Sequence, residues 1–289
     1  MAASASGRAN TPERTRTKAL QRLVVDLARR DFEERYPDRT LSPVVALICA
    51  YEEEANIAAV IAAVPKEACG LAVSTLVIVD GGDDDTAGVS RKHDALTFVL
   101  PANLGHGMAL RVGYRLCIEG GSRYVVTLDA DGQNDPAELP ELLAPLVDDT
   151  ADFVVASRRL GVDETSDLVR QAGVRFFAWL MNALTKAQLT DTSNGYRALR
   201  TSLLADVVDR LTQDQYQTAE LLITALGRGW RVAERPTVWH ERASGFSKKG
   251  TNLTFALRYT GVVLGTWWRE RRGVPRSGPP PAGSDGPGL

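Results

Sequence analysis

Five short apolar runs, each leading into a segment with helical or turn character, constrain the fold of this chain more than any other feature. The runs are rich in β-branched residues and span residues 44–50, 76–80, 97–100, 124–129 and 153–157. Runs of this length and composition are typical of buried, mainly parallel strands. Helix-like segments follow at 54–64, 108–119 and 137–147, the last after Pro136, which suits a first helical turn. The alternation predicts a doubly wound α/β sheet over about residues 42–160.

The two ends of the chain differ in composition from this α/β region. Residues 1–11 are small and polar, and residues 273–289 are dominated by Gly, Pro and Ser, so both are predicted to be disordered tails. Residues 12–40 form a predicted helical extension with Leu20, Leu23 and Leu27 spaced among charged residues. We interpret this extension as a brace packed on the main domain, as a dimer contact or as a membrane-surface contact.

Composition argues against several classes of function. The 34 basic and 36 acidic residues give a net charge of −2, so no basic footprint indicates a nucleic-acid partner. The three cysteines form no CxxC motif, which favours reduced thiols in a reducing compartment. No run reaches 18 apolar residues, and the first 20 residues lack the apolar core of a secretory signal. These features together predict a cytoplasmic protein.

An acidic segment follows the fourth apolar run directly. Residues 128–136 read LDADGQNDP, which places Asp129 and Asp131 two residues apart, with the amide of Gln133 beside them. Carboxylate and amide oxygens could hold Mg²⁺ or Mn²⁺ and leave coordination positions open for phosphate oxygens. Considered alone, the segment fits a solvated acidic turn equally well.

Two further segments carry glycines and polar residues at the ends of apolar runs. Residues 80–86 read DGGDDDT, in which Asp80 could meet a ribose or a base edge, although an Asx turn with a helix N-cap explains the same residues. Residues 103–113 read NLGHGMALRVG and place glycines at the start of a helix, where backbone amides favour an anion. These glycines could equally serve only to shape the turn.

Taken together, these segments resemble glycosyltransferase family 2, and within it the polyprenyl-phosphate (dolichyl-phosphate) mannosyl- and glucosyltransferase branch. The resemblance covers about residues 44–250. Residues 51–53 with Asn56 are similar to the opening Tyr-Asn-Glu motif, 77–86 to the VIVDDGSxDxT loop, 103–113 to NxGKGxAxxxG and 129–136 to DADxQ. Further on, 156–158 resemble GSR, 191–198 (DTSNGYRA) resemble DxxSGFRA, and Arg242 with 245–248 (GFSK) resembles RxxGxSK.

The resemblance implies a GT-A Rossmann-like domain with a mixed sheet over residues 41–250, and inverting transfer of a sugar from a nucleotide diphosphate. It implies that Mg²⁺ or Mn²⁺ is held by Asp129, Asp131 and Gln133, and that Arg242 and Lys248 face phosphate. Nucleotide-sugar binding is implied for Tyr51, Glu53, Asp80, Asn103, Gly105, Asp129, Arg158 and Lys248. The implied catalytic set is Asp131, Glu220, Asp191 and Arg242.

Two positions depart from the family pattern. Gly81 stands where the family usually has a second Asp, and His106 stands where it has Lys. Both positions belong to the nucleotide-binding segments, so the choice between a UDP-sugar and a GDP-sugar stays open.

The resemblance to the polyprenyl-phosphate branch and the apolar segment 253–268 suggest a lipid phosphate as the acceptor. A hydroxyl acceptor needs a base to take its proton, and Glu220 or Asp191 could serve, whereas a lipid phosphate arrives already ionised. The leading prediction is transfer to a polyprenyl phosphate. One alternative is a soluble hydroxylated acceptor, such as a secondary metabolite or a glycan precursor, with Glu220 or Asp191 as the base. Another is a nucleotide-sugar-binding protein that does not catalyse transfer.

Residues 251–272 are predicted to form an amphipathic helix. Its segment 253–268 is almost wholly apolar and ends in paired tryptophans followed by Arg269, Arg271 and Arg272. Trp and Arg at one end suit the headgroup region of a membrane, which predicts a peripheral contact on the inner face of the membrane. Packing of this helix on the catalytic domain is the alternative.

Overall fold

Strand β1 (Val44–Ala50) lies inside the sheet because both of its faces are apolar. Val45 and Leu47 point into one hydrophobic core, whereas Val44, Ala46 and Ile48 point into a second core on the opposite face. Strand side chains alternate between faces, so a strand that is covered on both sides needs a nearly continuous apolar sequence. The same alternation is found in β3 (Leu71–Asp80) and β5 (Tyr124–Asp129).

The computed structural model describes residues 11–164, 168–241 and 252–272. Within these ranges one eight-stranded mixed sheet has the order β2-β3-β1-β5-β7-β6-β8, and β4 pairs with β3. The pairs β3–β4, β1–β3, β1–β5 and β6–β8 are parallel, whereas β7 is antiparallel to both β5 and β6. The strands not yet bounded are β2 (Glu67–Ala68), β4 (Leu96–Leu100), β6 (Phe153–Asp163), β7 (Arg197–Arg200) and β8 (Val232–Trp239).

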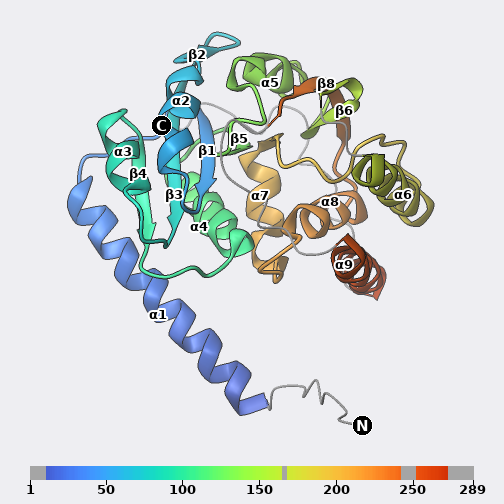
Figure 1. The fold of residues 1–289 in the computed structure, drawn as a ribbon, viewed down its shortest axis with the longest axis horizontal. Helices are drawn as coiled ribbons and strands as arrows, with labels where there is room; N and C mark the ends of the chain where they lie inside the picture. Colours follow the sequence, from blue (N-terminus) through green and yellow to red (C-terminus); the bar gives the residue numbers. More distant parts are fainter. Residues whose placement is uncertain (1–10, 165–167, 242–251, 273–289) are drawn as a thin grey trace.

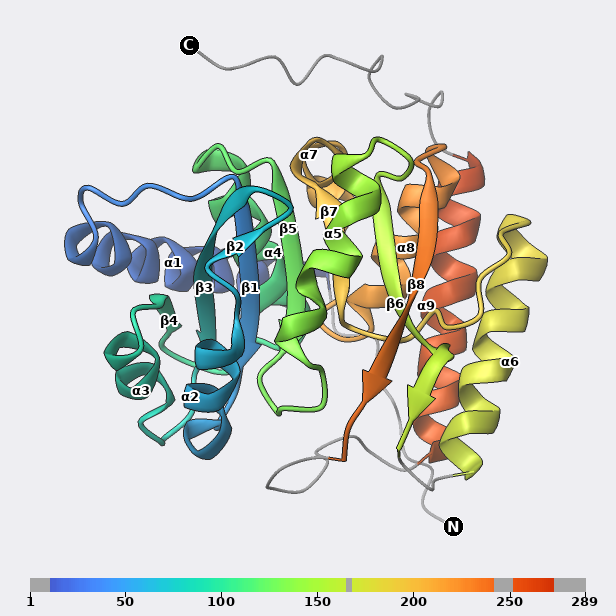
Figure 2. The same ribbon diagram turned by 90° about the horizontal axis from the view of Figure 1, so that it is seen from above.

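Helices cover both faces of the sheet and make a three-layer α/β/α architecture (Figures 1 and 2). The layer with α2 (Glu54–Ala63), α3 (Thr86–Lys92) and α5 (Leu139–Val147) encloses one core. The opposite layer contains α1 (Thr11–Arg35), α4 (His106–Glu119), α6 (Leu168–Thr185), α7 (Thr201–Val207), α8 (Gln217–Gly227) and α9 (Asn252–Arg272). Short 3-10 turns, Pro136–Glu138 and Val208–Arg210, precede α5 and follow α7.

The predicted α/β class and its mixed sheet are confirmed, and the strands at 44–50 and 124–129 have the predicted bounds. The sheet extends further than the predicted region 42–160, because β7 and β8 add two strands beyond it. β6 was predicted to end at Ser157 but continues to Asp163. Its exposed second half pairs with β8 across an irregularity between Ser157 and Val162, and it contains no continuous apolar run.

The N-terminal extension packs on the domain through the second half of α1. Phe32 is buried, and its ring lies 5.4 Å from that of Phe98 in β4. Leu20, Leu23 and Leu27 are more than half exposed, and the first half of α1 projects beyond the other elements (Figure 1). The structure therefore agrees with a brace for the second half, whereas the dimer and membrane contacts stay predictions for the first. The predicted tails at 1–11 and 273–289 fall almost wholly outside the described residues.

Helix α9 packs along α8 and α6 (Figure 2). Tyr259 and Val263 are buried in the core, and the indole Nε1 of Trp267 donates to the carbonyl oxygen of Leu184 at 2.8 Å. Packing on the domain, one of the two alternatives for this segment, is therefore observed. Among the described residues no helix combines the length and the apolar character needed to cross a membrane.

Candidate active site

The acidic segment after β5 lies where the sheet changes from parallel to antiparallel pairing. Asp129 ends β5, and a Cβ atom built on Gly195 would lie 3.2 Å from each of its carboxylate oxygens. Glycine at position 195 therefore lets the loop before β7 approach Asp129 closely. In the described part of the chain, no hydrogen bond or ion pair involves the Asp129 carboxylate, which is only partly exposed.

Asp131 and Gln133 belong to a turn that is attached to the end of β8. The Asp131 carboxylate is buried, and its Oδ1 accepts from the backbone N–H of Gln133 at 3.1 Å. The backbone N–H of His240 donates to the carbonyl oxygen of Gln133 at 3.0 Å, and the Gln133 amide nitrogen donates to the His240 carbonyl oxygen at 3.3 Å. β8 therefore fixes the position of this turn. Arg242 and Lys248, predicted to face phosphate, lie outside the described residues.

The residues at this turn fit a hard divalent cation. Two carboxylates and an amide oxygen offer the oxygen ligands that Mg²⁺ and Mn²⁺ take, and they are few enough to leave positions for a diphosphate. The partly buried carboxylate of Asp129 is the observation in favour, because a buried charge is usually paired or bound to a metal. The proposed set contains only two acidic side chains, Asp129 and Asp131. Among the described residues no group of three or more His, Cys, Asp or Glu side chains is placed to hold a metal.

Asp80 ends β3 beneath the loop that starts α4. Its two carboxylate oxygens accept from the backbone N–H groups of Leu104 and Gly105, at 2.8 and 2.9 Å. Burial raises the pKa of Asp80 to about 6, although the two backbone hydrogen bonds oppose this shift. The side chain is 4% exposed. Asp80 therefore connects the end of β3 to the loop before α4. Its direct contact with a nucleoside stays a prediction.

The departure at Gly81 has a physical cause. The residue has a φ of +71°, and a Cβ atom there would lie 2.6 Å from backbone atoms of Ala102 and Asn103. An aspartate in this conformation would be both strained and in collision with the backbone. Asn103 is itself exposed, and its side-chain oxygen accepts from the N–H of Gly105 at 3.1 Å.

Tyr51 and Glu53 lie beside the loop that follows β3. Glu53 occupies the N-cap position of α2 without a side-chain capping bond, and its Oε2 accepts from the Asn56 amide nitrogen at 2.7 Å. Its backbone N–H donates to the hydroxyl of Thr86 at 2.9 Å. A Cβ atom on Gly82 would lie 3.7 Å from the ring of Tyr51, so this ring is close to the predicted nucleotide loop.

The start of α4 packs against residues 212–214. The backbone N–H of Gly107 donates to the carbonyl oxygen of Asp214 at 2.9 Å, and a Cβ atom on Gly107 would lie 2.2 Å from the carbonyl oxygen of Gln213. The amides of Leu104, Gly105 and Gly107 thus all have partners within the chain. Of the two interpretations of these glycines, close packing is the one that the contacts favour over anion binding.

Glu220 is buried and supports this same loop. Its carboxylate accepts from the backbone N–H groups of Thr212 and Gln213, both at 2.9 Å, and pairs with Arg269 of α9 at 2.9 Å. The side chain is fully buried. A general base must reach the acceptor hydroxyl. These contacts do not support the predicted base role of Glu220, and they indicate that it positions the loop and α9.

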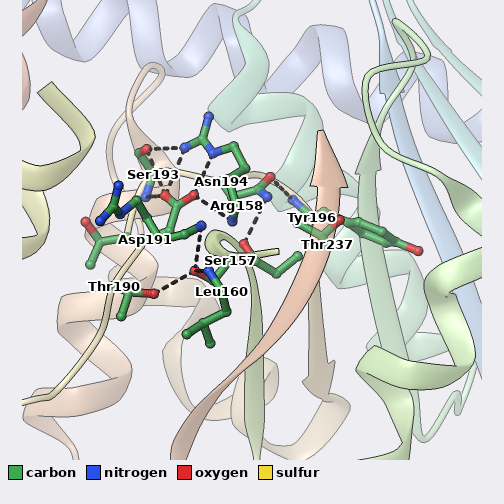
Figure 3. A network of polar contacts seen from close by, with 12 residues as sticks. Ser157, Arg158, Leu160, Thr190, Asp191, Ser193, Asn194, Tyr196 and Thr237 are labelled. Carbon is green, nitrogen blue, oxygen red and sulfur yellow. Dashed lines mark hydrogen bonds and ion pairs between the residues drawn. The ribbon is translucent and has the colours of Figure 1, made fainter. Parts of the chain in front are cut away.

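Asp191 is joined to Arg158 in a buried ion pair (Figure 3). The Arg158 Nε and Nη2 atoms donate to the two Asp191 oxygens at 2.6 and 2.9 Å, and Nη2 also donates to the hydroxyl of Ser193. Burial would raise the pKa of Asp191, but the hydrogen bonds and charge of Arg158 outweigh it and lower this pKa. A carboxylate held in this way is a poor proton acceptor, so its predicted base role also lacks support.

Two residues that support the 190–195 loop were not predicted, the partly buried Glu234 and the buried Arg197. Glu234 in β8 accepts from the backbone N–H groups of Thr190 and Asp191, at 2.8–2.9 Å. Arg197 is buried and donates to the carbonyl oxygens of Thr192, Asn194 and Thr218. An arginine within the motif 191–198 gave some signal for the second, whereas Glu234 lies in a strand that the sequence did not reveal.

Comparison with known proteins agrees with the expected family. The family model described as glycosyl transferase family 2 matches residues 45–208. The dolichyl-phosphate hexose transferase of Haloferax volcanii is 33% identical over 204 residues, which cover 71% of this chain and 86% of that protein. The polyprenol monophosphomannose synthase of Mycolicibacterium smegmatis is 28% identical over 242 residues, covering 76% and 86% of the two chains.

A solved structure has the same fold. Glucosyl-3-phosphoglycerate synthase from Mycobacterium tuberculosis, in complex with Mn²⁺ and uridine-diphosphate-glucose, superposes with a TM-score of 0.60. The two sequences are 20% identical, and the match covers 86% of this chain and 84% of that one. The family match, the relatives and the shared GT-A fold lead to one conclusion, which is that this chain is a glycosyltransferase and belongs to glycosyltransferase family 2.

Proposed function

We propose that this enzyme moves a hexose from a nucleotide-diphosphate sugar to the phosphate of a polyprenyl phosphate. A phosphate oxygen of the acceptor forms the new bond to the anomeric carbon, and the bond from that carbon to the nucleoside diphosphate breaks with inversion. The released nucleoside diphosphate carries away the electron pair of the broken bond. Relatives named as dolichyl- and polyprenyl-phosphate sugar transferases support this acceptor class.

The observation that carries the proposal is that each of the two candidate bases is paired with an arginine. Asp191 is paired with Arg158, Glu220 is paired with Arg269, and both carboxylates are fully buried. A hydroxyl acceptor would need a free base, whereas a phosphate needs none because it is ionised at neutral pH. A phosphate acceptor therefore fits the contacts of these two residues better than a hydroxyl does.

On the donor side, Asp129, Asp131 and Gln133 would hold the divalent cation, Mg²⁺ or Mn²⁺. The bound cation would supply charge neutralisation for the leaving diphosphate. Tyr51 and Glu53 border the nucleotide loop, and Asp80 fixes that loop to the start of α4. Arg242 and Lys248 are proposed to contact the diphosphate. The choice between UDP and GDP donors is left to the experiment.

A soluble acceptor is the second candidate. The glucosyl-3-phosphoglycerate synthase that shares the fold has also been solved in complex with phosphoglyceric acid, a soluble molecule. Phosphoglyceric acid carries a hydroxyl group beside its phosphate, so the rival reaction in this chain would be transfer to a hydroxyl. In this chain such a transfer would require a rearrangement that frees Asp191 or Glu220 from its arginine.

A donor screen tests the proposal. Purified enzyme with Mn²⁺ or Mg²⁺ is given UDP- and GDP-sugars, and nucleotide release is followed with farnesyl phosphate, with farnesol and with 3-phosphoglycerate. We expect farnesyl phosphate alone to stimulate release from one donor. Stimulation by farnesol or by 3-phosphoglycerate, with no response to farnesyl phosphate, would refute the proposed acceptor.

We also propose that the enzyme works at the cytoplasmic face of the membrane without spanning it. The outward face of α9 exposes Leu257, Leu264 and Trp268, and the neighbouring α6 exposes Phe176 and Trp179. Apolar and aromatic residues on adjacent helices suit the headgroup region, where a polyprenyl phosphate presents its phosphate.

A further inference from the structure

A surface cavity of about 360 Å³, largely open to solvent, lies between the outer half of β6, α6 and the loop before β7. Arg159, Arg175 and Trp179 are among its lining residues, and Thr190 forms part of its floor. None of these residues belongs to the proposed metal site or nucleotide loop. The cavity adjoins a second one of about 240 Å³, and Arg159 lines both.

The charges in the larger cavity favour an anion. Within the described residues neither Arg159 nor Arg175 forms an ion pair, and its lining contains no carboxylate. The smaller cavity differs, because it contains Asp163 and because Arg158 is already neutralised by Asp191. Glu234 lies behind Thr190 and directs its oxygens at the backbone N–H groups of residues 190 and 191. Two guanidinium groups that line one cavity, with no carboxylate among its described lining residues, suit a phosphate.

The floor of this cavity is formed by fixed contacts. The Asn182 amide nitrogen donates to the carbonyl oxygen of Leu189 at 2.7 Å, and the backbone N–H of Leu189 donates to the Asn182 side-chain oxygen at 3.0 Å. The hydroxyl groups of Thr190 and Ser157 lie 2.6 Å apart. These bonds tie α6 to β6, so the two arginines project from elements whose relative position is set before any ligand binds.

The rim of the cavity is apolar. Trp179 is 64% exposed, although tryptophan usually covers part of its ring in a folded protein. The ring of Phe176, which is 47% exposed, lies 6.0 Å from it along α6. A ligand whose phosphate lies between the arginines could therefore lay an apolar chain across the two rings. A free phosphate or a small polar phosphate ester would leave these rings uncovered.

We propose that this cavity captures the phosphate of the polyprenyl acceptor between Arg159 and Arg175, and that the isoprenoid chain leaves over Trp179 and Phe176. The inference rests on the proposed function, because its ligand is the proposed acceptor. Arg159 lines both cavities and so links the capture site to Arg158. Arg158 in turn binds Ser193 in the 190–195 loop, whose Gly195 lies beside Asp129. The phosphate thus enters on the side of the metal site that lies away from the nucleotide loop.

The test measures equilibrium binding of farnesyl phosphate, farnesol and 3-phosphoglycerate by calorimetry to the full chain, without donor. Each of Arg159→Gln and Arg175→Gln should weaken farnesyl phosphate binding by about tenfold or more, because each removes charge-assisted hydrogen bonds. Trp179→Ala should weaken farnesyl phosphate but not 3-phosphoglycerate. Arg30→Gln, which removes an exposed arginine of α1 far from the cavity, is the matched control.

Two results would overturn the assignment. One is farnesyl phosphate binding that is equal in wild type, Arg159→Gln and Arg175→Gln. The other is binding of 3-phosphoglycerate as tight as that of farnesyl phosphate with no effect of Trp179→Ala, which would make the cavity a general phosphate site. A measurement of sugar transfer to farnesyl phosphate distinguishes this inference from the proposed function on which it rests. Arginine-dependent binding without transfer to farnesyl phosphate would refute the proposed function and leave the capture site standing.

Where the wild type does transfer sugar to farnesyl phosphate, the arginine variants give a second readout. We expect the KM for farnesyl phosphate to rise by about tenfold while the KM for the donor changes much less. A fall in kcat with an unchanged acceptor KM would contradict a capture role.

Discussion

Glu220 shows how burial decides what a carboxylate can do. Its oxygens hold the backbone of Thr212 and Gln213 and the guanidinium of Arg269, so we expect a loss of stability when either partner changes. Glu220→Gln and Arg269→Gln should each lower the free energy of unfolding by about 2–4 kcal/mol. Urea unfolding measures this change, and turnover per folded molecule should fall to a similar extent in both variants. Loss of turnover in Glu220→Gln alone, at unchanged stability, would restore its role as a base.

Asp80 predicts a pH dependence of stability. Its pKa is raised by burial to about 6 from an ordinary value of 3.8, so the folded state holds this proton more tightly than the unfolded state does. The contribution of Asp80 to stability is therefore fully present below about pH 4 and is lost as the pH rises through about 6.

Unfolding of wild type and Asp80→Asn, compared from pH 4 to pH 7, checks this sign. The wild type should lose roughly 2–3 kcal/mol relative to the variant across this window, because the asparagine does not titrate. Parallel pH profiles for the two proteins would show that Asp80 titrates normally.

For single residues, the sequence predicted which residue types form the site better than it predicted their hydrogen-bond and ion-pair partners. The segment with Asp129, Asp131 and Gln133 stands out because an apolar strand runs directly into it. The pairing of Arg158 with Asp191 joins residues 33 positions apart, and it depends on how two loops meet. Local spacing contains no information on such a pairing, so Arg158 was assigned to nucleotide-sugar binding and Asp191 to a base role instead of to each other.

Among the elements, the start of α4 depends on close backbone contact with residues 212–214. Gly107→Ala would place a Cβ atom 2.2 Å from the carbonyl oxygen of Gln213, which must then move. We expect a loss of about 2–3 kcal/mol in urea unfolding, in the upper range for overpacking. Gly173→Ala in α6 is the matched control, because nothing lies within 4 Å of its added Cβ atom. This control should gain about 0.5–1 kcal/mol from helix propensity. Equal effects of the two substitutions would contradict the packing explanation.

Helix α9 tests the proposed membrane contact. Deleting it would remove Tyr259 and Val263 from the core, so substitutions on the outward face are more informative. Leu264→Glu and Trp268→Glu should reduce flotation with liposomes that contain anionic lipid, without lowering the free energy of unfolding. Val147→Glu, at an exposed position of α5 in the opposite helix layer, is the control for a general effect of added charge. Unchanged flotation of the α9 variants would refute the contact.

The elements that could be predicted are those with an apolar pattern of their own. Strands β1 and β5 are buried on both faces, and their bounds were predicted correctly. β8 contains Glu234, Arg235 and Pro236 among its apolar residues, and the outer half of β6 is exposed. Their pairing is decided by the neighbouring strand rather than by composition, which is why β8 and the outer half of β6 were not predicted.

In the whole molecule, the candidate site lies where two groups of strands meet, and within each group the strands are parallel. β4, β3, β1 and β5 form one group, β6 and β8 form the other, and antiparallel β7 joins them. Asp129 ends the last strand of the first group, and the loop that enters β7 contacts it at Gly195. The proposed donor residues lie on one side of this junction, and the proposed capture cavity lies on the other.

A ligand that binds at this junction should stabilise the entire fold. With Mn²⁺ and the preferred nucleoside diphosphate at about 100 times the Kd, binding adds about 2.7 kcal/mol, equivalent to roughly 5–10 °C in Tm for a domain of this size. We expect Mn²⁺ and nucleotide together to produce this shift in the wild type and EDTA to reverse it. Asp131→Asn should abolish it, because the variant removes a proposed ligand charge. Asp135→Asn is the matched control, since the Asp135 side chain caps the following turn through the N–H of Ala137 and an asparagine can do the same. A full shift in Asp131→Asn would mean that the cation is held elsewhere.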